Sequence, residues 1–161
     1  MVSKLLSNVM PTYGNKSLEF VKGKGCYLYS SQNTKYLDFA SGIAVNSLGH
    51  CHPKLIEALN KQSKQLWHVS NLYKIKKQEQ FANLLCKNSF ADKVFFTNSG
   101  SEANDTNIRL IRRYWDLKKQ PKKRFIIARK NAYHGSTIAA ASLGGFNAVH
   151  KQFETLPYIS H

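Results

Sequence analysis

The order of apolar and polar positions first predicts strands. Residues 18–40 hold three short apolar runs, at 18–21, 26–29 and 36–39, separated by Gly-containing and polar segments. Short β-rich runs divided in this way are typical of a small meander or hairpin. A glycine-containing loop over residues 40–50 follows, and it ends the strand-rich part of the chain.

Two amphipathic helices are predicted next. Pro53 lies where a first helical turn tolerates proline, and the helix is expected to run to about Trp67. The second helix spans residues 76–87. The inward-facing residues expected for the two helices are Leu55, Ile56, Leu59 and Leu66 in the first, and Phe81, Leu84 and Leu85 in the second.

From residue 94 onward, strands and helices alternate. Residues 94–96 and 125–128 are predicted to be short buried strands. Small-residue turns then lead into a helix that begins at Glu102 and into a second helix over 137–143. Strand, loop and helix repeated in this order indicate an α/β fold with a largely parallel sheet. The residues after 143 show no regular period.

The amino-acid composition adds one unusual feature, a large positive net charge. The chain of 161 residues contains 24 Lys and Arg but only 9 Asp and Glu, which gives a net charge of +15. Such an excess would favour binding to nucleic acid, to an anionic surface or to an anionic ligand. It is also compatible with a piece of a larger protein in which positive and negative charges are more nearly equal. The seven cations in 118–130 are interpreted as a solvated face. Nucleic acid is not the expected partner, because RNA-binding strand signatures and zinc patterns are both missing.

Cellular location and metal binding are constrained by what the sequence lacks. The three cysteines are widely spaced and imply no disulfide framework. No signal peptide and no membrane span is recognised, so a cytoplasmic protein is expected. The run His50-Cys51-His52 offers three potential ligands, but adjacent residues rarely converge on one ion. No metal site is predicted.

Two loops could carry chemistry. The loop 98–104 connects a predicted strand to a helix, where backbone N–H groups at the positive end of the helix dipole can bind a phosphate. Gly100 allows close approach, and the hydroxyls of Ser99 and Ser101 can add hydrogen bonds. The alternative is an ordinary N-cap. In the second loop, Tyr133 could stack on a planar ring, and in a parallel sheet both loops open at the same edge.

These residues resemble the class-III, fold-type-I aminotransferases, which use pyridoxal phosphate. Residues 10–97 are most similar to acetylornithine aminotransferases, and residues from about 98 onward to ω-amino acid–pyruvate aminotransferases. The stretches that carry the first similarity are 10–14, 36–46, 48–53, 67–73 and 90–97, and those that carry the second are 99–107, 112–118 and 131–137.

The resemblance implies roles for three residues. Gly100 and Ser101 would hold the cofactor phosphate, and Tyr133 would stack on the pyridine ring. It also implies that residues 1–50 contribute to the small domain, whereas 51–161 form the first part of the large cofactor-binding domain. Family members form dimers, with the segment from Trp67 to Tyr73 expected near the interface.

Two departures from the family pattern matter. Ser136 stands where acetylornithine aminotransferases have an arginine that binds the substrate carboxylate, and serine cannot make that bidentate contact. The Schiff-base lysine of the family lies beyond His161, so no catalytic residue is assigned and the chain is expected to be an amino-terminal fragment. It is also expected to be poorly soluble in isolation.

Three functions follow from these observations. The leading hypothesis is transfer of an ω-amino group to a 2-oxo acid, with N-acetylornithine and 2-oxoglutarate as substrates in arginine biosynthesis. The first alternative is an ω-amino acid–pyruvate aminotransferase. The second is a non-catalytic fragment that binds anions or nucleic acid through its basic surface.

Overall fold

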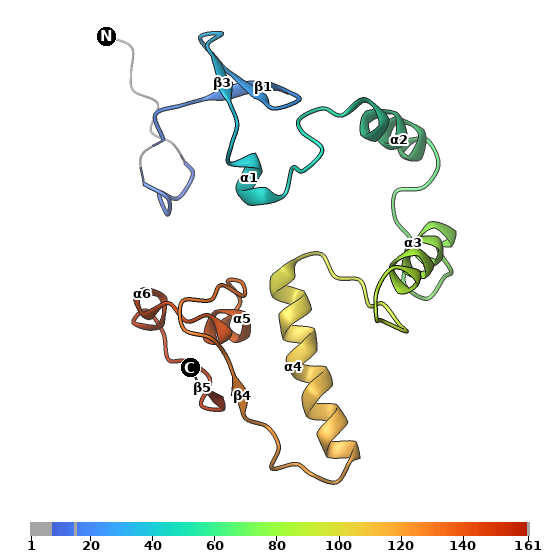
Figure 1. Cartoon of the computed structure of the whole chain (residues 1–161), viewed down its shortest axis with the longest axis vertical. Helices are drawn as coiled ribbons and strands as arrows, with labels where there is room; N and C mark the ends of the chain where they lie inside the picture. Colours follow the sequence, from blue (N-terminus) through green and yellow to red (C-terminus); the bar gives the residue numbers. More distant parts are fainter. Residues whose placement is uncertain (1–7, 15, 161) are drawn as a thin grey trace. The chain divides into compact units, whose positions relative to one another are not determined.

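The computed structural model describes residues 8–14 and 16–160 (Figure 1). The chain divides into two compact units, 1–74 and 75–161. The expected division near residue 50 concerns the domains of a complete aminotransferase fold, and it stays a prediction. Within the described residues, no helix is both long and apolar enough to span a membrane.

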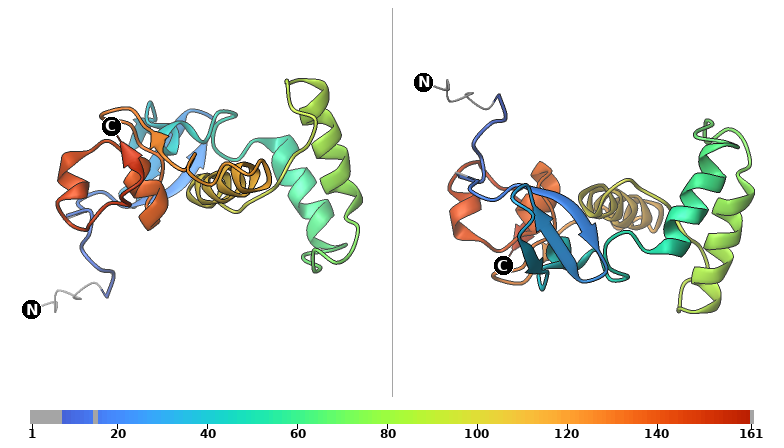
Figure 2. Two further views of the ribbon diagram at one scale, coloured as in Figure 1. Left: turned by 90° about the horizontal axis from the view of Figure 1, so that it is seen from below. Right: turned by 90° about the horizontal axis from the view of Figure 1, so that it is seen from above.

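The first unit contains the predicted meander. Strands β1 (Phe20–Lys24), β2 (Tyr27–Ser30) and β3 (Lys35–Leu37) form an antiparallel sheet in the order β1-β2-β3, seen as blue to dark-teal arrows in the right-hand view of Figure 2. Tyr27 pairs with Lys24 on one side and with Leu37 on the other. The β1–β2 connection contains Gly25 with a φ of +56°, a conformation that glycine adopts without steric cost.

A polar cluster fixes the loop after the meander. Short helix α1 (Ser41–Ala44) has positive φ at all four residues and is therefore a left-handed turn. The Asp38 carboxylate accepts hydrogen bonds from the Ser41 N–H at 2.8 Å and from His50 Nε2 at 2.7 Å. Asn46 Nδ2 lies 2.9 Å from His50 Nδ1. These bonds join the two ends of the loop and hold the turn in place.

Helix α2 (Pro53–Ser63) begins at the predicted proline but ends before the predicted Trp67. The Trp67 indole N–H instead donates to the backbone carbonyl of Ser63 at 2.6 Å, which satisfies one acceptor at the helix end. The apolar residues expected to face inward are exposed, with Leu59 at 69%. An amphipathic helix needs another surface to bury its apolar stripe, and the described residues of the first unit do not provide one.

In the second unit, helix α3 (Lys76–Lys87) has the predicted bounds. Phe81 stacks on Phe96 with ring centroids 5.7 Å apart. The inward-facing assignment was wrong, because Phe81 is 52% exposed and Leu84 is 57% exposed. As in α2, the helical period was predicted correctly, but burial depends on a neighbouring surface.

The core of the second unit lies between α4 (Gly100–Leu117) and α5 (Ile138–Leu143). Its buried apolar residues among those described are Ile108, Ala140, Ala141 and Leu143. The alanines of α5 permit close approach to α4, since they bring little side-chain bulk. This contact positions the loop before α5 against the first turns of α4.

The remaining strands differ from the prediction. Residues 94–96 form no strand, because no described segment pairs with them. Strand β4 (Ile126–Ile127) pairs in parallel with β5 (Ile159–Ser160), and helix α6 (Asn147–His150) precedes β5 in the segment where no period was recognised. The predicted burial of 125–128 was wrong for Phe125 and Ile127, which are 72% and 89% exposed.

Candidate functional site

Helix α4 begins with a capping box, in which the residue just before the helix, Ser99, and the third residue of the helix, Glu102, are hydrogen-bonded to each other. The Ser99 hydroxyl accepts a hydrogen bond from the Glu102 N–H at 3.2 Å and lies 3.3 Å from Glu102 Oε2. The helix begins at Gly100, two residues before the predicted Glu102. The N-cap interpretation is thus correct for Ser99, whose hydroxyl serves the helix.

Gly100 and Ser101 are the first two residues of the helix. Within the described part of the chain, their backbone N–H groups have no hydrogen-bond acceptor. A Cβ added to Gly100 would meet no atom within 4 Å, so the surface in front of it is open. Unpaired N–H groups at the positive end of an 18-residue helix form an arrangement that can bind an anion.

Glu102 stabilises the loop before the helix. Asn98 Nδ2 donates to Glu102 Oε1 at 3.3 Å, and this bond, followed by the hydrogen bond from the Asn98 backbone N–H and by those from Ser99, lowers the pKa of the carboxyl below its usual value of 4.5. The carboxylate is therefore ionised at neutral pH, where a negative charge in the first helical turn is favourable. Its hydrogen bonds hold Asn98 and Ser99 at the helix entrance.

The second predicted loop is attached to the same end of α4 by three hydrogen bonds. The Ser136 N–H donates to Ser101 Oγ at 3.1 Å, which leaves the Ser101 hydroxyl hydrogen available as a donor. Asn104 Nδ2 donates to the His134 carbonyl at 2.6 Å. The Thr137 hydroxyl donates to Asp105 Oδ1 at 2.8 Å, and it also caps α5 by accepting from the Ala140 N–H. The structure thus brings the two candidate loops together.

Close packing at Gly135 makes this contact possible. Gly135 has a φ of +133°, and an added Cβ would overlap Ser101 Oγ and lie 2.8 Å from Ser101 Cβ. Only glycine fits here without displacement of the helix or the loop. Tyr133 is two residues away in the same loop.

Tyr133 lies at the edge of a cavity of about 280 Å³, and its side chain is 74% exposed. The cavity is also lined by Gly135 and Ser136 and, on its apolar side, by Phe146 and Phe153. No lysine is among the described residues that line it. An exposed aromatic ring beside an apolar wall can accept the face of a planar ligand.

Sequence reasoning missed the residues that join the two loops. Asn104 and Asp105 follow Ser101 at spacings of three and four, so all three lie on one face of α4. That spacing of polar residues at the start of a predicted helix was the available signal. Thr137, the residue before the predicted small-residue helix, was a second signal as an N-cap.

The histidine-rich run in the first unit has another role. His50 contacts Asp38 and Asn46, and Cys51 has a φ of +54°. In residues 8–14 and 16–160, no group of three or more His, Cys, Asp or Glu side chains is arranged to hold a metal ion.

Comparison with known proteins gives a consistent assignment. Residues 9–160 match the family Aminotransferase class-III. Acetylornithine aminotransferase of Caldanaerobacter subterraneus is 48% identical over 92% of this chain, and that of Agrobacterium fabrum is 48% identical over 83%. The chain spans only 38% and 34% of the lengths of these two relatives.

Solved structures show the same fold. An engineered omega transaminase from Pseudomonas jessenii has a TM-score of 0.84 and 34% identity over 89% of this chain, which corresponds to 33% of that protein. A PLP-bound aminotransferase mutant from Vibrio fluvialis has a TM-score of 0.84 and 32% identity over 90% of this chain and 33% of its own. The expected fold class, the amino-terminal part of a fold-type-I aminotransferase with mixed α/β content, is confirmed.

Proposed function

The chain belongs to the class-III aminotransferases, and from this membership we propose that it is the amino-terminal part of a transaminase that uses pyridoxal phosphate. When bound, this cofactor supplies an electron sink for chemistry at the carbon that carries the amino group. The observation that carries the proposal is the docking of the 133–137 loop onto the open N-terminus of α4.

The described residues fit the cofactor in two places. The N–H groups of Gly100 and Ser101, together with the Ser101 hydroxyl, would bind the phosphate through neutral donors and the helix dipole. The exposed ring of Tyr133 would stack on the pyridine ring and orient it. The chain's own contribution is therefore to bind and orient the group, and the family's Schiff-base lysine is expected outside these residues.

For the substrates, we favour N-acetylornithine as amino donor and 2-oxoglutarate as acceptor, in arginine biosynthesis. Support comes from relatives named acetylornithine aminotransferase that are 48% identical to this chain. As in other members of the family, we expect a homodimer, with the segment from Trp67 to Tyr73 near the interface.

The second candidate is transfer between an ω-amino acid and pyruvate. Ser136 favours it, because a hydroxyl cannot form the paired hydrogen bonds that an arginine makes with a carboxylate. In this structure the Ser136 N–H is used to hold the loop on Ser101. Solved structures titled as omega transaminases are 34% identical to the chain.

The cofactor site can be tested on this chain with pyridoxine 5′-phosphate, which has the ring and phosphate of the cofactor but no aldehyde to react with surface lysines. We expect saturable binding that Tyr133→Ala weakens about tenfold, in line with the value of one aromatic stacking contact. Tyr13→Ala is the matched control, because Tyr13 is 88% exposed and belongs to the other unit. Equal binding by both variants would contradict the assignment of Tyr133.

The substrate question needs the protein encoded by the complete reading frame. Rates with N-acetylornithine plus 2-oxoglutarate should exceed those with an ω-amino acid plus pyruvate. If the order is reversed, and if Ser136→Arg restores activity with 2-oxoglutarate, the second candidate is the correct one.

A further inference from the structure

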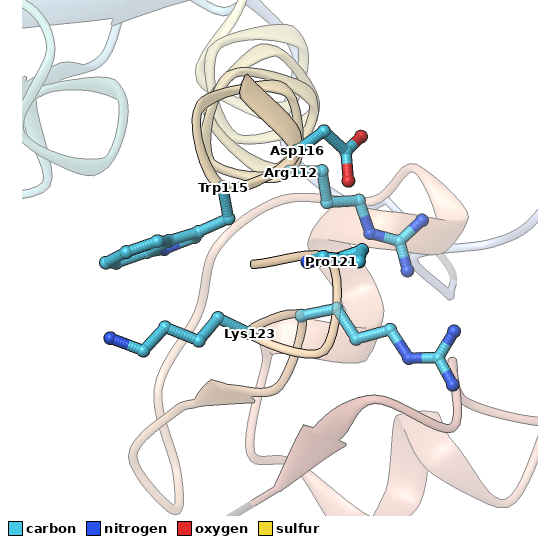
Figure 3. A pocket seen from close by; sticks show the side chains of 6 residues that line it. Arg112, Trp115, Asp116, Pro121 and Lys123 are labelled. Atoms are coloured by element: carbon cyan, nitrogen blue, oxygen red, sulfur yellow. The ribbon is translucent and has the colours of Figure 1, made fainter. Parts of the chain in front are cut away.

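A second cavity lies along α4, away from the candidate cofactor site. It has a volume of about 250 Å³ and six lining residues: Arg112, Trp115, Asp116, Pro121, Lys123 and Arg124. Figure 3 shows Arg112, Trp115 and Asp116 projecting from the helix, with Pro121 and Lys123 on the loop opposite. Arg112 is eleven residues beyond Ser101, which corresponds to about 16 Å along the helix.

The charge around this cavity is strongly positive. Three cations and a single carboxylate line it, which leaves a net charge of +2. Over residues 109–130 the sequence has ten Lys or Arg and one acidic residue, Asp116. None of these ten cations forms an ion pair within the described part of the chain. Among the described residues, Asp116 offsets only one of these ten charges, and solvent ions or a ligand would relieve the remaining repulsion.

Aromatic rings hold two of the cations in place. The Arg112 guanidinium lies 3.7 Å from the centre of the Tyr158 ring, and Lys123 Nζ lies 4.1 Å from the centre of the Trp115 ring. In Figure 3 the lysine side chain runs parallel to the indole. These contacts restrict the side chains but leave their positive charge uncompensated.

Arg112 has an unused donor at this position. Its Nε is buried and has no hydrogen-bond partner among the described residues. A buried N–H without an acceptor is rare in proteins, since such groups are normally paired with protein or water. An arginine presents Nε–H and Nη–H side by side, in the geometry that matches two oxygens of one oxyanion.

We propose that this cavity binds a phosphoryl group, with Arg112 as the bidentate donor and with Lys123 and Arg124 compensating the remaining charge. The net charge of the lining matches a phosphate dianion, and the Arg112 guanidinium, whose buried Nε–H has no partner among the described residues, supplies the directed donors. The face of Trp115 covered by Lys123 is unavailable for stacking, so recognition is of the phosphate and not of an attached ring. This inference does not depend on the proposed transaminase function.

The test uses Trp115 as a local reporter. The protein contains two tryptophans, so a Trp67→Phe background makes the emission report on Trp115 alone. Sodium phosphate is titrated at constant ionic strength against sodium chloride, and the Arg112 Nε–H resonance is followed by NMR. We expect both signals to change together and to saturate. Phosphate bound at Gly100 or Ser101 is too far away to move them.

Three variants test whether the phosphate binds in this cavity. Lys123→Gln together with Arg124→Gln should weaken phosphate binding at least about tenfold, as expected for lost charge-assisted contacts. Lys119→Gln together with Lys122→Gln removes the same charge from the same loop outside the cavity, and it should change binding less than twofold. Arg112→Lys keeps the charge but removes the fork, and it should weaken the phosphate-dependent change in Trp115 emission.

A second titration, with a 12-residue oligouridylate, distinguishes the two possible sources of the phosphoryl group. Saturation by inorganic phosphate identifies a small phosphate ligand, whereas a response to the oligonucleotide alone identifies backbone phosphate. The proposal is overturned if neither probe gives a saturable signal, if chloride gives the same response, or if the two double variants lose binding equally.

Discussion

Replacing Gly135 with alanine should detach the loop 131–137 from helix α4. The new methyl group would overlap Ser101 Oγ and lie 2.9 Å from Ala140 Cβ, in a residue whose φ of +133° is unfavourable for any side chain. Backbone strain of this kind costs about 1–3 kcal/mol, and overpacking costs about 1–3 kcal/mol. Together they give about 2–6 kcal/mol, which is a loss of the docked conformation of at least about thirtyfold.

Hydrogen exchange measured by mass spectrometry can follow this change. The Ser136 amide donates to Ser101 Oγ, so peptides containing residue 136 should exchange faster in Gly135→Ala. Gly100→Ala is the matched control, because a Cβ at Gly100 meets no atom within 4 Å. If the Gly135→Ala loop is as protected as in the parent chain, the docking geometry described above is incorrect.

Three further predictions follow from the hydrogen-bond networks. Hydrogen bonding to His50 lowers the pKa of Asp38 below 3.8, so the folded state gains stability above the unfolded pKa and loses it as pH falls through the folded value. Asp38→Asn should therefore lower the melting temperature at pH 6, and this difference should shrink as the pH falls below the unfolded value of 3.8 and through the lowered folded pKa. Thr137→Val removes the cap of α5 and the bond to α4, and it should cost about 1–2 kcal/mol in denaturant unfolding, whereas Thr137→Ser should retain most of that stability. Asn98→Ala should raise the pKa of Glu102 toward its usual value in a carboxyl NMR titration, and an unchanged pKa would contradict the assigned cause.

The sequence was most informative where local physics decides the structure. The bounds of α3, the proline at the start of α2 and the three-stranded meander were predicted correctly. Each depends on neighbouring residues: a helical period, a first-turn proline, or short strands joined by tight turns. The two loops that form the candidate site were also recognised, because small residues between an apolar run and a helix are a local signal.

Burial and pairing were predicted less well, because they depend on distant surfaces. Phe95 and Ile127 lie in apolar segments that were predicted to be buried strands, but their side chains are 76% and 89% exposed. An extended segment becomes a strand only when another segment pairs with it. Strand β4 pairs with Ile159–Ser160, in a part of the chain where no regular hydrophobic period was recognised. The bond from Asn104 to the His134 carbonyl joins residues thirty positions apart, which no local pattern encodes.

We propose that the start of α4 and the 133–137 loop together bind the phosphate and ring of pyridoxal phosphate. A ¹H–¹⁵N NMR titration of this chain with pyridoxine 5′-phosphate tests this binding at the residues themselves. We expect the amide resonances of Gly100 and Ser101 and the ring protons of Tyr133 to shift together and to saturate with one affinity. Unmoved Gly100 and Ser101 amides at saturating ligand, or shifts confined to other residues, would contradict it.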